Sequence, residues 1–358
     1  MTAHFPHALI RYDAAMIACW SREAPAPDDD PQARLVLVGP ALDAAGAAEI
    51  VPTWNADTPA DSWIEIQLRT RRGGRWSKPY RIAAWDSAPA ASRRTSFSRQ
   101  DAADDLVSTD TLLLAAPAEA IQARVLLCAA PGANTPNVES LALCLTDARR
   151  PMPDAGRLSA LDARRSAIKL PLLLSQFLSF PGGAGWCSPT SLAMCLAYWR
   201  ERTGDPRLAA FVAAACVPDL AAPMINDPAW EGTGNWAFNT AYAASLGLTA
   251  YVTRMHNLAQ VARWTTDGVP VICSLAWQAG ELDGAPGVTS GHLNVILGFA
   301  DGYALVAEPS SRDMAQILRR YPTDQLHACW QRNSRGVVYL VYPPGHPHPA
   351  PGPGDAWV

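Results

Sequence analysis

The sequence has little excess charge of either sign and no long apolar run. Its 29 lysine and arginine residues and 33 aspartate and glutamate residues leave a net charge of −4 over 358 residues. Proteins that bind nucleic acid present a basic surface to the phosphates, so we expect no nucleic-acid partner. No apolar run approaches the roughly 20 residues that a transmembrane helix needs, so we expect no membrane span. The first 25 residues also lack the long apolar core of a signal peptide, which favours a cytoplasmic location and leaves secretion open.

The patterns of a metal or cofactor site are also missing. The eight cysteines include no CxxC pair, and none joins a histidine at the spacing of zinc ligands. Most cysteines lie inside apolar runs, as Cys144 and Cys273 do, which favours buried free thiols over a disulfide framework. His346 and His348 lie in the proline- and glycine-rich stretch 344–358, which we interpret as a disordered tail rather than a metal site. We therefore expect no metal and no cofactor.

Residues 1–146 have the pattern of an all-β domain. Ile64, Ile66 and Leu68 alternate with polar residues, as in a strand with one buried face. Glycine-, proline- and aspartate-containing turns separate five further predicted strands, at 34–38, 76–85, 111–115, 121–128 and 141–145. Short strands at this spacing are typical of a β-sandwich or jelly roll.

Four tryptophans of this domain admit two interpretations. Trp54, Trp63, Trp76 and Trp85 could stack on sugar rings, and a glycan is then a partner of the domain. Aromatic residues are also common in the cores of sheets. Core packing is the favoured interpretation.

Residues 147–167 indicate a linker, because charges, prolines and small residues replace the strand pattern. The second domain, 168–343, favours an α+β fold. The predicted helices begin at Cys187 and cover 208–216, 235–246, 258–266 and 323–330. The predicted strands are 270–277, 292–299, 303–307 and 337–342.

The glycine-rich turn 181–185 leads directly to Cys187 and the first of these helices. Apolar residues recur at i, i+3, i+4 and i+7, which predicts one buried face: Leu192, Cys195, Leu196 and Trp199. Ser188 suits the N-cap and Pro189 the first turn. A helix N-terminus favours negative charge, and a cysteine reacts as a thiolate. We therefore predict that Cys187 is a catalytic nucleophile.

A cysteine nucleophile needs a base, and His292 is the candidate. It follows a glycine and opens the apolar stretch 293–299, so its imidazole lies at the start of a strand that a helix N-terminus can face. His256 begins a helix, and His327 lies within the predicted helix 323–330. These two positions favour structural roles.

The base in turn needs an orienting group, and the nucleophile needs an oxyanion hole. A turn at Asp301–Gly302 returns the strand 303–307 antiparallel to the first, which brings Glu308 next to the predicted base. Asn294 and Asn235 are alternative orienting groups. Gln176, upstream of the nucleophile, can donate to an oxyanion together with the backbone N–H of the cysteine.

In this order, the four residues resemble the site of the papain-like superfamily. The sequence is most similar to cysteine peptidase family 39, the bacteriocin-processing type, in its broader bacterial C39-like branch. The matching pieces are Gln176, Cys187–Met194, Gly234–Ala243, Gly268–Val271, Gly291–Phe299 and Glu308–Pro309. The resemblance covers residues 168–343 and implies a papain-like domain of helices plus an antiparallel sheet, preceded by a β-sandwich module.

The resemblance implies Cys187 as nucleophile, His292 as general base and Gln176 as oxyanion donor. Glu308 stands where the family usually has aspartate, and Ser188 stands where a glycine commonly follows the nucleophile. The extra methylene of Glu308 must be accommodated if its carboxylate is to reach the base. No ATP-binding part accompanies these motifs, so export of a leader peptide is not implied.

The predicted function is hydrolysis of a peptide or amide bond through a thiolate and an acyl-enzyme. A papain-like acyltransferase or amidase would use the same residues, and the sequence does not separate these activities. A third hypothesis is a non-catalytic binding protein with a carbohydrate-binding-like sandwich, against which the intact cysteine–histidine pair argues.

Overall fold

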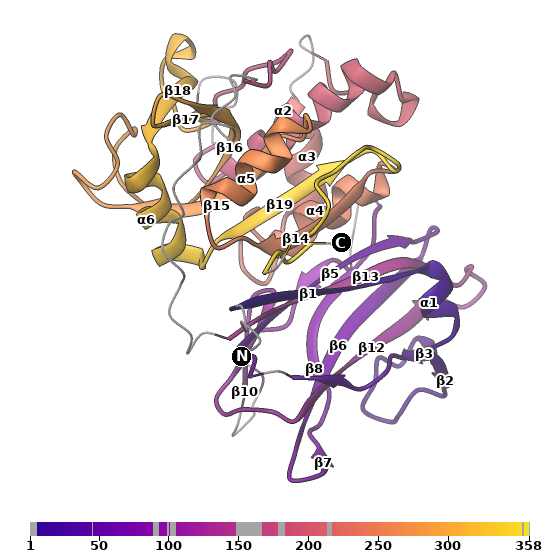
Figure 1. Cartoon of the computed structure of the whole chain (residues 1–358). Helices are drawn as coiled ribbons and strands as arrows, with labels where there is room; N and C mark the ends of the chain where they lie inside the picture. The colour runs from indigo at the N-terminus through magenta and orange to yellow at the C-terminus, as the bar shows by residue number, and fades with distance from the viewer. Residues whose placement is uncertain are drawn as a thin grey trace.

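The computed structural model describes residues 6–44, 46–88, 93–98, 100, 105–147, 167–177, 183–212, 217–352 and 354–357. Figure 1 shows strands of the N-terminal half below a mixed layer of helices and strands from the C-terminal half. Of the predicted linker 147–167, all but its first and last residue lie outside the described residues.

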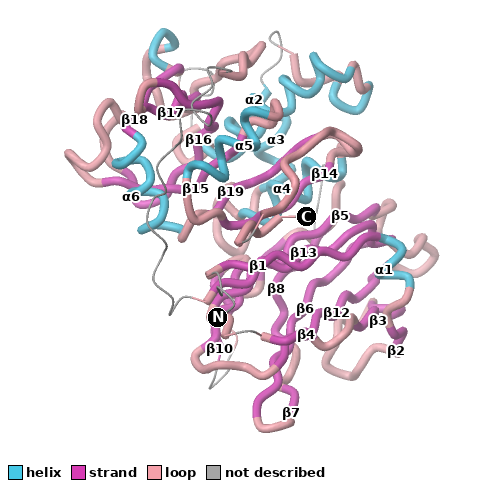
Figure 2. Tube along the Cα trace, viewed as in Figure 1, coloured by secondary structure: helices cyan, strands magenta, loops and turns pink. Residues whose placement is uncertain are grey.

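The N-terminal half contains two antiparallel sheets. The first holds, in spatial order, β1 (His7–Asp13), β13 (Asn137–Thr146), β5 (Glu49–Asp57), β11 (Thr111–Leu114) and β10 (Asp105–Ser108). The second holds, in spatial order, β2 (Ser21–Glu23), β3 (Ala33–Val38), β12 (Ala120–Ala129), β6 (Ser62–Arg72), β8 (Tyr80–Trp85) and β9 (Thr95–Ser96). The short strands β4 (Leu42–Asp43) and β7 (Arg75–Trp76) pair with β12 and β6, respectively. The short helix α1 (Ala14–Ala18) follows β1, and Figure 2 shows strands in most of this half.

Trp54 and Trp85 join the two sheets at one end of this half. Their rings, from β5 and β8, meet edge to face at 6.4 Å between centroids. Both residues and Trp63 are buried, so these three aromatic faces are unavailable to a sugar. Trp76 is half-buried, and the guanidinium groups of Arg69 and Arg71 lie over its ring. The structure therefore gives no support to glycan contact through these tryptophans.

The C-terminal half contains one six-stranded antiparallel sheet. Its strands are, in spatial order, β14 (Thr249–Arg254), β19 (Val337–Tyr342), β15 (Val271–Trp277), β16 (Thr289–Ala300), β17 (Tyr303–Ala307) and β18 (Leu318–Pro322). The helices are α2 (Cys187–Thr203), α3 (Val217–Ile225), α4 (Trp236–Ser245), α5 (Leu258–Thr266) and α6 (Thr323–Ser334). Single 3-10 turns occur at Pro206–Leu208 and Met314–Gln316. None of the described helices has the length and hydrophobicity needed to cross a bilayer.

Helix α2 is buried on all sides along most of its length. Every residue from Cys187 to Trp199 is buried, whereas the sequence predicts one buried face. The reason is that α2 packs against β16 as well as α3 and α4. The predicted cap is also wrong: the helix begins at Cys187, and the Ser188 hydroxyl donates to Oδ1 of Asn239 at 2.8 Å.

The helix predicted at 208–216 is wrong over its described part. The backbone N–H of Phe211 donates to the carbonyl of Leu208, and that of Val212 donates to Ala210, which is turn geometry and not an α-helix. Residues 213–216 lie outside the described residues. The helix propensity of an alanine-rich segment is small compared with the effect of tertiary packing.

The stretch 344–357 is packed, so the prediction of a disordered tail is wrong for its described residues. Trp357 is 1% exposed and lies against Trp264 of α5. Asp355 accepts a hydrogen bond from Gln260 at 2.6 Å and pairs with Arg263. Apolar burial of an indole and these polar contacts together fix the proline-rich chain on α5.

The two halves are in contact through buried side chains. Phe238 of α4 packs against both Trp54 and Trp85. Arg254 of β14 pairs with Glu49 of β5 at 2.7 Å. The contact therefore combines an aromatic cluster with a shielded ion pair.

Candidate active site

Cys187 is the first residue of α2, and a glycine turn positions it. Gly185 has a φ of +92°, a left-handed conformation that favours glycine. The backbone N–H of Trp186 donates to the carbonyl of Gly183, and that of Thr190 donates to the carbonyl of Trp186. The thiol therefore lies at the N-terminal end of a buried helix, where unpaired N–H groups favour a negative charge.

His292 lies between Cys187 and Glu308. The Cys187 thiol lies close enough to the imidazole of His292 to raise its pKa, and the two side chains line the same two cavities. Nε2 of His292 donates to Oε1 of Glu308 at 2.5 Å. Trp277 meets the imidazole edge to face at 5.2 Å and covers it. The imidazole is therefore bonded to an acid and lies at the cavities that Cys187 lines.

The β16–β17 hairpin brings Glu308 to His292. Ala307, the last residue of β17, pairs with Val295 of β16, and Glu308 follows directly. The 2.5 Å contact shows that the longer glutamate side chain is accommodated. Both residues are buried, so water does not screen their interaction.

Donors surround the Glu308 carboxylate. Oε1 accepts hydrogen bonds from the backbone N–H of Ser310 at 2.9 Å and from its hydroxyl at 2.6 Å. Oε2 accepts one from the hydroxyl of Tyr321 at 3.0 Å and a longer one from Nδ2 of Asn294 at 3.4 Å. Each of these bonds favours the ionised form of the acid.

The two buried groups shift each other's proton affinity. Burial lowers the pKa of His292, but the Glu308 carboxylate and Cys187 raise this pKa by more than burial lowers it, so the net shift is upward. Burial raises the pKa of Glu308, but His292 and Ser310 lower it more, and the net shift is downward. The arrangement thus favours an imidazolium next to a carboxylate.

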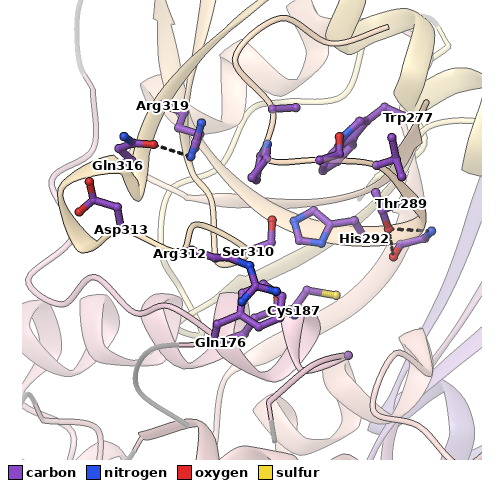
Figure 3. A pocket seen from close by; sticks show the side chains of 17 residues that line it. Gln176, Cys187, Trp277, Thr289, His292, Ser310, Arg312, Asp313, Gln316 and Arg319 are labelled. Atoms are coloured by element: carbon purple, nitrogen blue, oxygen red, sulfur yellow. Dashed lines mark hydrogen bonds between the residues drawn. The ribbon is translucent and has the colours of Figure 1, made fainter. Parts of the chain in front are cut away.

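Gln176 is held next to the same hairpin. Its backbone N–H donates to the carbonyl of Pro309 at 2.8 Å. Its side chain is buried, lines a cavity with Cys187 and His292, and has no partner for Oε1 among the described residues. Figure 3 shows these three side chains around that cavity.

The other residues considered as orienting group or base hydrogen-bond to groups other than the imidazole of His292. Asn235 caps α4 by accepting from the backbone N–H of Phe238 at 3.1 Å. Asn294 contacts Glu308 instead of the imidazole. His327 bonds through Nε2 to the carbonyl of His256 at 3.1 Å, and neither of these histidines lines the cavities next to Cys187.

Two cavities meet at Cys187 and His292. The first, of about 800 Å³, includes Gln176, Trp277, Arg312 and Arg319 among its lining residues. The second, of about 580 Å³, lies between the turn 108–111 of the N-terminal half and the loop 230–234. The nucleophile is therefore accessible from a cleft with two arms.

The sequence did not identify Tyr321 or Ser310, and it did not identify Asn294 as a donor to the acid. Ser310 follows the predicted acid by two residues and could have been found from the sequence, because a serine so close in the chain can donate its hydroxyl to the carboxylate. Tyr321 comes from the next strand, and no local signal identifies it. Of the described residues, no group of three or more histidine, cysteine, aspartate and glutamate side chains has the geometry to hold a metal ion.

Residues 172–338 match the model of the Peptidase_C39 like family. Residues 36–146 match the model of the peptidase C39 N-terminal domain. This confirms the resemblance inferred from the sequence. A comparison with curated proteins finds no match.

Two solved structures are similar to about half of the chain. A double glycine motif protease from an AMS/PCAT transporter, in complex with the leader peptide, shares 17% identity; the similarity covers 51% of this chain and 96% of that one, with a TM-score of 0.30. A structure described as a C39-like peptidase from Bacillus anthracis shares 14% identity over 49% of this chain and 95% of that one, with a TM-score of 0.32.

Proposed function

We propose that this protein is a cysteine peptidase that hydrolyses a peptide or amide bond through a thioester at Cys187. The observation that carries the proposal is the position of His292, which lines the same cavities as Cys187 and is hydrogen-bonded to the Glu308 carboxylate. Such an arrangement is the usual way in which a protein activates a thiol and orients its base.

In the proposed first step, the thiolate sulfur of Cys187 attacks the carbonyl carbon and forms a C–S bond. The backbone N–H of Cys187 and the side chain of Gln176 donate hydrogen bonds to the oxyanion that develops. The C–N bond then breaks, and the amine leaves with the proton that His292 gives up. Glu308 keeps the imidazole oriented and favours its charged form.

In the second step, water attacks the thioester and His292 accepts its proton. The C–S bond breaks, the acid product leaves, and the thiolate–imidazolium pair is restored. An acyltransferase would differ only here, since an amine would replace the water. The intact pair and its buried carboxylate support catalysis over a purely binding role.

We further propose that residues 168–343 form a papain-like peptidase domain and residues 1–146 a separate β-sandwich domain. In support, the nucleophile begins a central helix, and the base lies on a strand that packs against that helix. The match of residues 172–338 to the Peptidase_C39 like family supports the assignment of peptide-bond chemistry to the C-terminal half.

The direct test is hydrolysis of a quenched fluorescent peptide library by the wild type, Cys187→Ala and Cys19→Ala. Cys19 is an exposed free thiol and serves as the matched control. We expect the wild type and Cys19→Ala to cleave the same peptides, and Cys187→Ala to cleave none. Mass spectrometry of the products separates hydrolysis from transfer, because transfer to an added amine changes the mass of the acyl product. Equal activity of Cys187→Ala would contradict the proposal.

A further inference from the structure

The smaller cavity next to the nucleophile is built by both halves of the chain. Its N-terminal side is the turn Ser108–Thr111, which joins β10 to β11. Its opposite side is the loop Trp230–Gly234, and Cys187 and His292 also line it. The N-terminal domain therefore contributes to a cavity that reaches the reacting atoms.

The turn Ser108–Thr111 is fixed against the peptidase half. Oδ2 of Asp110 accepts a hydrogen bond from the backbone N–H of Trp236, the first residue of α4, at 2.6 Å. Asp110 is only 5% exposed. Thr109 has a φ of +55°, which is unusual for a β-branched residue and persists only where the surroundings hold it. The turn is thus a rigid side of the cavity.

The loop on the opposite side presents one large aromatic side chain. Trp230 is 48% exposed, so much of its surface is open. A Cβ atom at Gly232 would lie 2.7 Å from the indole ring, and one at Gly234 would lie 2.8 Å from it. Because the two glycines lack a Cβ atom, the indole ring can pack directly against the backbone of the loop.

The exposed surface of this cavity is more apolar than polar, although serine and threonine residues also line it. Trp230, Trp236 and Leu293 supply apolar surface, and the residues that line it include no lysine or arginine. Its two acids are Asp110, which is already bonded to α4, and Glu231. The first cavity, by contrast, contains Arg312 and Arg319.

The apolar surface continues beyond Trp230 along the junction of the two halves. A third cavity shares Ser108, Thr109 and Trp230 with the second and adds Phe97 and Leu106. Leu106 is 47% exposed. Exposed apolar side chains next to a concave site usually mark the binding of an apolar group.

We propose that the N-terminal domain determines substrate specificity, and that the cavity between Ser108–Thr111 and Trp230–Gly234 binds a large aliphatic or aromatic side chain of an extended peptide substrate. This inference rests on the proposed peptidase function, since the peptide must reach Cys187. Trp230 and Ser108 act here as specificity-determining residues and take no part in bond breaking.

The test uses the full chain and a positional library of quenched fluorescent octapeptides. Trp230→Ala removes the aromatic surface, and Ser108→Arg places a long charged side chain at an exposed position of the turn. The matched controls are Trp76→Ala and Asn134→Arg, at positions of the N-terminal domain that line none of the three cavities. Alkylation of Cys187 by iodoacetamide reports on the nucleophile, and thermal unfolding reports on the fold.

In the wild type, we expect a preference of roughly tenfold or more in kcat/KM for a leucine or phenylalanine over serine at one library position. Trp230→Ala and Ser108→Arg should reduce this ratio to near one, whereas the controls should keep it. A preference for basic residues at that position, or an unchanged apolar preference in both variants, would overturn the inference while cleavage itself upholds the peptidase function. Loss of Cys187 alkylation in the two variants would also overturn it, because the effect would then lie at the nucleophile. Absence of cleavage in the wild type would refute the peptidase function and this inference with it.

Discussion

Nε2 of His292 lies 2.5 Å from Oε1 of Glu308, and both side chains are buried. A carboxylate at this distance, away from water, stabilises the imidazolium form of its partner. The pair thus couples the charge state of the base to the thiol on its other side. Most of the expected behaviour of the site follows from this contact.

Replacing Glu308 by glutamine should lower the alkaline limit of activity. The Glu308 charge raises the pKa of His292, so its removal lets that pKa fall and the imidazolium is lost at a lower pH. We expect kcat/KM to decrease by about ten- to a hundredfold near neutral pH. The measurement is a pH–rate profile of Glu308→Gln, with Glu281→Gln as control, because Glu281 pairs with Arg332 at the surface. An alkaline limb at the wild-type position would contradict the role of the carboxylate.

Replacing Tyr321 by phenylalanine should have a smaller effect of a different kind. Its hydroxyl stabilises the ionised form of Glu308, and its loss should move the acid limb of the pH–rate profile to higher pH. We expect a decrease of roughly three- to tenfold in kcat, in line with one lost hydrogen bond to a charged group. Tyr303→Phe is the control, since Tyr303 is exposed. A uniform loss of activity without a shifted limb would indicate only a packing defect.

Asp110 should make the stability of the protein depend on pH. Burial raises the pKa of this carboxyl from 3.8 to about 6, so the folded state holds the proton more tightly than the unfolded chain. Its contribution to stability is fully present below pH 3.8 and is lost as the pH rises through about 6. Relative to Asp110→Asn, the wild type should lose up to about 3 kcal/mol between these limits.

Urea unfolding at a series of pH values measures this difference. Asp301→Asn is the control, because Asp301 is exposed in the β16–β17 turn. A difference between wild type and Asp110→Asn that stays constant across the range would show that Asp110 titrates normally.

The packed C-terminal stretch should contribute strongly to stability. Trp357→Ala removes an indole that is 1% exposed, and large-to-small changes of this kind cost about 3–5 kcal/mol. The same change at the half-buried Trp76 should cost much less. Urea unfolding at one pH compares the two. Equal, small losses would support a loosely attached tail.

The sequence was sufficient to predict the central hairpin of the site. An Asp–Gly turn between two apolar strands determines which residues lie next to each other, and this is how Glu308 could be placed near His292 before the contact was known. A cysteine after a glycine turn and before a helical pattern likewise predicts where α2 begins. These features depend on interactions that are local in the chain.

Other features depend on contacts between distant segments. Asp110 and Trp236 are separated by 126 positions, and no local sequence pattern predicts their hydrogen bond. The burial of α2 on every side follows from its neighbours and not from its own periodicity. The packing of Trp357 on α5 could not be predicted for the same reason. The proline-rich composition around Trp357, considered without its contacts, indicates disorder.

The reactivity of Cys187 relative to Cys19 is the most direct measurement of the central claim, that Cys187 is a nucleophile activated by His292. Both thiols are free, and Cys19 is exposed whereas Cys187 is buried, so accessibility alone favours Cys19. We predict that limiting iodoacetamide at pH 6 alkylates Cys187 faster than Cys19 in the folded protein, as followed by peptide mass spectrometry, and that His292→Ala reverses this order. Faster alkylation of Cys19 in the wild type, or an order that His292→Ala leaves unchanged, would contradict the account.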